Sequence, residues 1–145
     1  MTNGELVLVI STAVAGVNAA VWIPIVRRLR AMAARIARDL ANERVARGPE
    51  RANYSGASAE YSKVRGTGKL ALTDRRLVFY KVFGAPIEIA RADIASATTA
   101  RSFKSERHVG RTHLVVKTTR GIELGFIVAD PAAWIGALGL SNPAT

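Results

Sequence analysis

The chain has 145 residues, no cysteine and a formal net charge of +10 at pH 7. The absence of cysteine excludes a disulfide framework and any metal site built on thiolates. All but one of the charged side chains lie after residue 26, where 21 are basic and 10 are acidic. This excess favours an anionic partner, such as an acidic protein, a nucleic acid or an anionic membrane surface.

The N-terminal segment 1–26 contains a long run without charge. Residues 6–26 carry no charged side chain and no histidine. As a helix this run is about 31 Å long, close to the hydrocarbon core of a bilayer. The sequence therefore predicts a short tail and a transmembrane helix over 1–26. A cleaved signal peptide and a buried soluble helix are the alternatives. The first is disfavoured by the missing basic n-region and the second by apolar residues on every side.

The flanks of this run predict its orientation. Residues 1–5 contain no Lys or Arg, whereas Arg27, Arg28 and Arg30 follow directly. The positive-inside rule then places the N-terminus outside and the larger part of the chain in the cytoplasm, at the inner membrane. Small residues four apart form a candidate transmembrane dimer face, namely Thr12, Gly16 and Ala20. Pro24 is expected to kink or end the helix.

Residues 27–43 predict an amphipathic linker helix. Its apolar side chains recur at helical spacing and its arginines fall on the opposite side. The apolar stripe consists of Ile25, Leu29, Met32, Ile36 and Leu40. Two placements remain open at this point. The helix either lies on an anionic leaflet through Arg27, Arg28 and Arg30, or packs on the following domain or on a second copy.

Residues 44–140 have the pattern of a mainly β domain, followed by a tail over 141–145. Short apolar runs with period two are separated by turn residues, which predicts a meander of antiparallel strands. The clearest strand covers 122–128, where alternate residues are apolar. Asp130 is a good N-cap and Pro131 suits the first helical position, so a short C-terminal helix is expected to close the domain.

Three stretches of this domain resemble a known family. They are residues 68–79, residues 87–94 and Phe126 followed by residues 130–134. Over about 43–140 the chain resembles bacterial PH-like and GRAM-like domains. The resemblance implies a bent antiparallel sheet or barrel of about seven strands, capped by one C-terminal helix. It also implies a binding or scaffold module, usually found at membranes, that is not an enzyme.

The candidate site residues are basic. In lipid-binding PH domains the first hairpin loop places basic side chains around a phosphorylated headgroup. The resemblance therefore implies anionic-lipid contacts at Lys63, Arg65 and Lys69. Residues 66–69 only partly match a phosphate-binding loop, because Leu70 stands where Ser or Thr is needed. No catalytic set, metal site or cofactor is predicted.

Three functions follow from these observations. The leading one is a membrane-anchored binding or scaffold module whose ligand is a protein partner or an anionic lipid. The second is a basic nucleic-acid-binding protein, which is disfavoured because the tyrosines are not interleaved with basic residues. The third is an oligomeric membrane scaffold that forms homodimers through its N-terminal helix.

Overall fold

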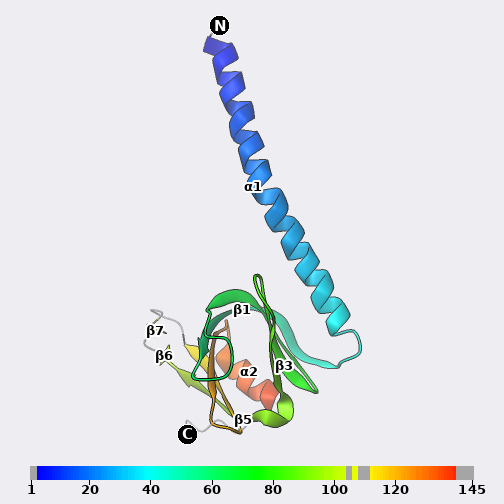
Figure 1. Ribbon diagram of the computed structural model, residues 1–145, viewed down its shortest axis with the longest axis vertical. Helices are drawn as coiled ribbons and strands as arrows, with labels where there is room; N and C mark the ends of the chain where they lie inside the picture. Colours follow the sequence, from blue (N-terminus) through cyan, green and yellow to red (C-terminus); the bar gives the residue numbers. More distant parts are fainter. Residues whose placement is uncertain (1–2, 104–105, 108–111, 140–145) are drawn as a thin grey trace. The chain divides into compact units, whose positions relative to one another are not determined.

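The computed structural model describes residues 3–103, 106–107 and 112–139, with side chains described for 20–101, 103 and 112–139. The chain divides into two compact units, residues 1–38 and residues 39–145. Figure 1 shows that the first is one helix and that the second is built on strands.

Helix α1 runs from Asn3 to Asp39 as one element of 37 residues. Pro24 was expected to kink or end the helix; it lies inside α1, so the helix does not end there. A proline removes one hydrogen bond of the helical ladder, and the turns on both sides keep theirs. The residues after Pro24 are mostly Arg, Ala, Leu, Met and Ile, and all but Ile are strong helix formers. The uncharged run and the arginine-bearing segment therefore belong to one continuous helix.

The predicted transmembrane anchor is contradicted. Among the residues that the structure describes, no helix is long and apolar enough to cross a membrane. This finding corrects the fold class, and it also contradicts the single-pass inner-membrane location with the N-terminus outside.

The second unit contains one seven-stranded antiparallel sheet in the order β4-β3-β2-β1-β9-β8-β5. Its strands are β1 (Val45–Ala57), β2 (Gly66–Thr73), β3 (Arg76–Lys81), β4 (Ile87–Ala90), β5 (Ile94–Ala100), β8 (His113–Thr118) and β9 (Glu123–Ile127). The 3-10 helix η1 (Arg91–Asp93) joins β4 to β5. The short strands β6 (Ser102–Phe103) and β7 (Glu106–Arg107) pair with each other. The predicted antiparallel sheet is confirmed.

One face of the sheet holds the core. Tyr54, Phe79 and Phe126 come from three strands and lie with ring centroids 5.4 to 5.8 Å apart. Each is at most 1% exposed. Period-two alternation sends these rings to the same face, and their contacts close the interior around the long strand β1.

Helix α2 (Pro131–Leu138) closes the core as predicted. The Asp130 carboxylate caps it by accepting a hydrogen bond from the backbone N–H of Ala133. Trp134 is fully buried, and its indole N–H donates to Glu50 of β1 at 3.1 Å. The guanidinium of Arg47 lies 5.4 Å from the indole ring centroid and also pairs with Glu50. The helix is therefore fixed to β1 by both apolar and polar contacts.

Candidate functional site

The two predicted loop residues lie together, and Lys69 lies elsewhere. Lys63 and Arg65 are exposed on the β1–β2 loop, on either side of Val64. Lys69 is exposed on β2, where its cross-strand partners are Arg51 of β1 and Tyr80 of β3. The remaining candidates, Arg27, Arg28 and Arg30, are exposed on α1 in the other unit. The side chains of Thr12 and Gly16, from the predicted dimer face, lie outside the described part.

A cleft of about 580 Å³ separates the β1–β2 loop from the β3–β4 loop. The side chains that matter for its chemistry are Tyr61, Ser62, Val64, Lys81, Phe83 and Glu88. The β3–β4 loop can turn sharply because Gly84 adopts a φ of 107°, a conformation that side chains disfavour. Pro86 follows within the same loop and precedes the short edge strand β4. Two neighbouring loops thus form an open, partly apolar recess.

Lys81 holds the wall of this cleft in place. Its ammonium donates to the Ser62 hydroxyl at 2.8 Å and to the Val64 carbonyl oxygen at 3.3 Å. It also lies 5.3 Å from the centroid of the Tyr54 ring. The Tyr54 hydroxyl donates to the Ser62 carbonyl oxygen at 2.5 Å, and burial raises the pKa of this hydroxyl to about 12. The Lys81 ammonium and the Tyr54 hydroxyl therefore both hold the β1–β2 loop through hydrogen bonds.

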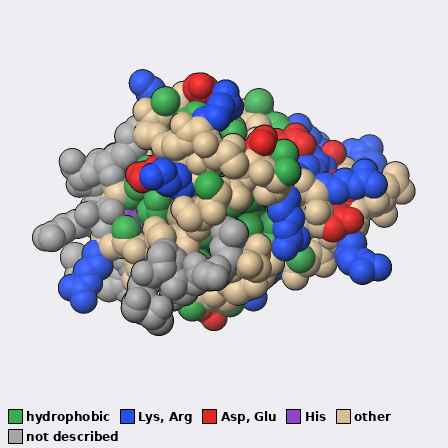
Figure 2. All heavy atoms as spheres, turned by 90° about the horizontal axis from the view of Figure 1, so that it is seen from below, with side chains coloured by type: hydrophobic (Ala, Val, Ile, Leu, Met, Phe, Trp, Pro, Cys, Tyr) green, Lys and Arg blue, Asp and Glu red, His purple; other side chains and the backbone are tan. Residues whose placement is uncertain are grey.

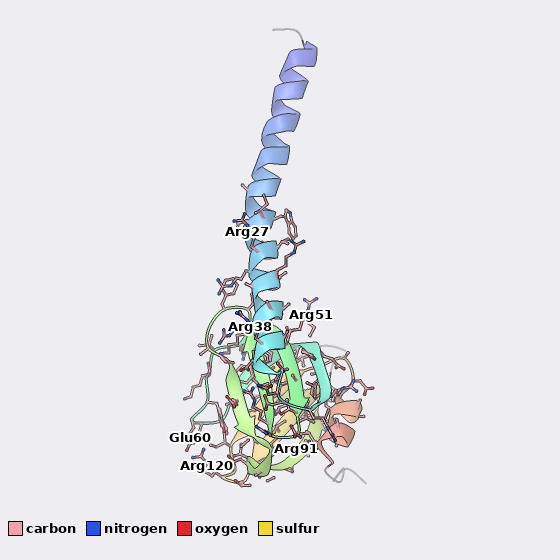
Figure 3. All side chains as sticks on the ribbon, turned by 90° about the vertical axis from the view of Figure 1, so that its right-hand side faces the viewer. Arg27, Arg38, Arg51, Glu60, Arg91 and Arg120 are labelled. Atoms are coloured by element: carbon pink, nitrogen blue, oxygen red, sulfur yellow. The ribbon has the colours of Figure 1, made fainter. Side chains whose placement is uncertain are left out.

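A surface ion pair fixes the far side of the same loop. Glu60 lies 2.8 Å from Arg120, which belongs to the β8–β9 turn, and Figure 3 shows the two side chains next to each other. Glu60 adopts a φ of 59°, in the left-handed region that non-glycine residues seldom occupy. The pair removes Glu60 as a free negative charge near Lys63 and Arg65.

The tips of both loops are apolar. Val64 and Phe83 are each 71% exposed, the largest values among the exposed large apolar side chains of the described residues. They come from different loops and line the same cleft. The combination of two apolar tips with neighbouring cations is an amphipathic surface.

The Arg76 cluster lies next to this cleft and shares Glu88 with it. Arg76 donates to both carboxylate oxygens of Glu43, and it pairs with Asp39 at 3.1 Å and with Glu88 at 3.0 Å. The hydrogen bond from Arg76 lowers the pKa of the Glu43 carboxyl. The Tyr80 hydroxyl donates to Asp39, and burial followed by this bond raises its pKa. These charges are satisfied within the cluster, so they hold the segment after α1 against β3.

Sequence reasoning missed Lys81 and Phe83. Strand β3 ends at Lys81. Phe83 therefore falls in the turn, and it is 71% exposed. The signal was the Gly84 that follows it, because a glycine at a strand end often marks a turn.

The structure also bears on the other motifs. Residues 66–69 form the start of β2, which agrees with the expected mismatch to a phosphate-binding loop. Among the described residues, no group of three His, Asp or Glu side chains could hold a metal ion. On the face drawn in Figure 2, basic side chains occur at separate places, several with an acidic side chain beside them.

Comparison with known proteins assigns no function. No protein-family model matches the chain, and no curated protein matches it. Among solved structures it is similar to the crystal structure of the C-terminal domain of an unknown protein from Leishmania infantum. The two are 21% identical, the match covers 77% of this chain and 95% of that one, and the TM-score is 0.49. The resemblance to PH-like and GRAM-like domains stays a prediction.

Proposed function

We propose that this chain is a non-catalytic binding module whose β1–β2 and β3–β4 loops dock on a surface of anionic lipid headgroups. The contact is peripheral and involves no spanning helix. One observation carries the proposal: the apolar tips Val64 and Phe83 line one cleft and are flanked by Lys63 and Arg65. Apolar side chains enter the headgroup region and cations bind its anionic groups, so both parts fit one partner.

The energies fit a weak, reversible contact. Burying a Val or Phe side chain contributes about 2 kcal/mol, and each basic side chain at an anionic surface contributes about 1 kcal/mol. Two apolar tips and two exposed cations therefore supply about 6 kcal/mol, before the cost of ordering the loops. This corresponds to a dissociation constant of about 0.04 mM, and the cost of ordering the loops makes it weaker. Such a module needs a second attachment or a high lipid concentration.

The test measures the fluorescence of a tryptophan placed in the β3–β4 loop. We would place a fluorophore at the tip with Phe83→Trp in the full chain, in a Trp22→Phe background. The remaining Trp134 is fully buried in the core. We expect a blue shift and quenching by doxyl lipids with phosphatidylserine vesicles, and neither effect with phosphatidylcholine alone. Unchanged emission while the chain co-sediments with the anionic vesicles would overturn the proposal.

Further variants distinguish binding through the loops from non-specific adsorption to the vesicles. Lys63→Ala together with Arg65→Ala should weaken the vesicle affinity measured by this fluorescence change at least tenfold, because both flanking cations are lost. Val45→Ser is the control, since Val45 is also an exposed apolar side chain but lies on β1 outside the cleft. Equal losses in both would show that the loops have no special role.

A further inference from the structure

Helix α1 carries an exposed apolar stripe. Trp22, Ile25 and Leu29 are 61%, 44% and 49% exposed, and Met32 follows at the same spacing. The steps between these four residues are 3, 4 and 3 positions, which is how the a and d positions of a coiled coil recur. The next position of the series, Ile36, is buried. Single exposed apolar residues need no explanation, but several in one stripe mark an interaction surface.

This stripe lies on a different side of the helix from the predicted face of small residues. At about 100° per residue, Ala20 of that face lies about 160° around the helix from the middle of the stripe. Upstream of Trp22, residues 6–21 carry no charged side chain. No charge in that part of the sequence therefore opposes an apolar contact that runs along α1.

The two flanks of the stripe differ in charge. With Leu29 at position a, the two g positions beside the stripe are Arg28 and Arg35, and the two e positions are Val26 and Ala33. All four flanking residues are exposed. The other arginines of the segment fall at positions b, c and f, on the side away from the stripe, namely Arg27, Arg30 and Arg38. One flank is thus basic and the other is uncharged.

This difference favours one kind of partner. When two identical helices pack in parallel, the g flank of each faces the e flank of the other, so arginine meets valine or alanine. An antiparallel pair would bring the two basic flanks together, and like charges across an interface oppose binding. An anionic surface attracts cations on both sides of an apolar stripe and gives no reason for an uncharged flank. A second parallel copy accounts for both flanks.

We propose that this stripe binds the same stripe of a second copy of the chain, parallel and in register. Trp22, Ile25 and Leu29 would each pack on their counterparts, as a and d side chains do in coiled coils. The methylene stems of Arg28 and Arg35 would cover the edge of the contact while their guanidinium groups stay in water. The contact lies within α1 and does not depend on the loop cleft.

Disulfide cross-linking tests the contact directly, because the natural chain has no cysteine. We would express the full chain as Leu29→Cys, oxidise intact cells with copper phenanthroline and separate the products without reductant. A disulfide needs Cα atoms within about 7 Å, which facing positions of the two copies would satisfy. Ala31→Cys is the control, since Ala31 is exposed on the opposite side of the helix. We expect at least tenfold more covalent dimer from Leu29→Cys, and equal yields would overturn the proposal.

A second cysteine position tests the direction of the two helices. In a parallel, in-register pair every position of the stripe faces itself, so Ile25→Cys should cross-link as well as Leu29→Cys. In an antiparallel pair only a position next to the twofold axis faces itself. Cross-linking at one of these positions and not at the other would therefore overturn the parallel arrangement. A stripe covered by a membrane surface or by the rest of its own chain would give no cross-link above the control.

A charge placed in the stripe should break the contact. Leu29→Arg in the Ile25→Cys chain should reduce covalent dimer at least tenfold, whereas Ala31→Arg adds the same charge on the other side and should change it less than twofold. Equal loss in both would show that only net charge matters. Both positions are exposed, and urea unfolding checks that the sheet unit stays folded. Phe83→Ser alters the loop cleft and should leave cross-linking unchanged, so failure of the loop contact and failure of this one are separable.

Discussion

Removing the guanidinium of Arg76 should destabilise the sheet unit by about 2–3 kcal/mol. Glu43 is only 9% exposed at its side chain, and it receives bonds of 3.0, 3.1 and 2.6 Å from Arg76. In Arg76→Met the remaining side-chain partner of Glu43 is the Thr73 hydroxyl at 3.2 Å. Breaking a fully buried pair costs about 3–5 kcal/mol, and the 15% exposure of Arg76 lowers this figure somewhat.

Urea unfolding of the full chain measures the effect. Trp134 fluorescence in a Trp22→Phe background reports on the core, because Trp134 is fully buried. With an m value of about 1–1.5 kcal/mol/M, the midpoint should fall by about 2 M. A double-mutant cycle of Arg76→Met with Glu43→Gln should give a coupling of about 2 kcal/mol. A coupling below about 0.5 kcal/mol would show that the Arg76–Glu43 pair is not the main cause of the stability lost in Arg76→Met.

The same pair predicts acid sensitivity with a defined sign. Because Arg76 lowers the folded-state pKa of Glu43, the stabilisation is present above the unfolded-state pKa of about 4.3. It is lost as the pH falls through the lower folded-state pKa. The wild-type chain should therefore lose more stability between pH 5 and about pH 3 than Arg76→Met does. Equal acid losses in the two proteins would contradict the pairing.

Three further predictions concern the core. Gly68→Ala should destabilise the fold by about 3 kcal/mol or more, since a Cβ there would lie 1.9 Å from a backbone carbonyl oxygen of β3. Gly66→Ala should be tolerated, because nothing lies within 4 Å of a Cβ at that position. Thermal unfolding of the two variants measures the difference. Trp134→Phe should cost about 2 kcal/mol through lost volume and the lost bond to Glu50, and an unchanged melting temperature would disprove it. Tyr54→Phe should remove an absorbance transition at 295 nm near pH 12, because the Tyr54 phenol has its pKa raised to about 12. The neutral phenol stabilises the fold below the ordinary tyrosine pKa of about 10, and this stabilisation is lost as the pH rises above that value.

The sheet and its closing helix could be predicted because their signals are local. Period-two alternation over 122–128 contains β9, and the Asp130–Pro131 cap begins α2 at the expected residue. Turn residues and alternation report on the next few residues of chain, which is also the range over which a strand or a helix start is decided. Local signals also have a limit, which Pro24 shows: this single residue suggested that the helix could end there, but α1 continues through it.

The position of Lys69 could not be predicted from its neighbours in sequence. It follows the β1–β2 loop closely, so the sequence groups it with Lys63 and Arg65. In the fold its partner is Arg51, and β1 has register shifts between Val45 and Arg47 and again between Arg47 and Glu50. Such bulges change which residues oppose each other, and no sequence pattern reveals them. Cross-strand charge pairs therefore need the structure.

The four phenylalanines show why the loop tips matter for binding. Phe79, Phe103 and Phe126 are at most 7% exposed, and Phe103 covers the small Gly125 so closely that a Cβ there would lie 2.4 Å from its ring. Phe83 is 71% exposed. A single exposed apolar side chain needs no explanation. Here, however, a second one, Val64, is equally exposed and lines the same cleft, with a cation on either side of it. Because the core is complete without these two side chains, replacing them should leave stability nearly unchanged while abolishing the loop contact, which separates a binding role from a structural one.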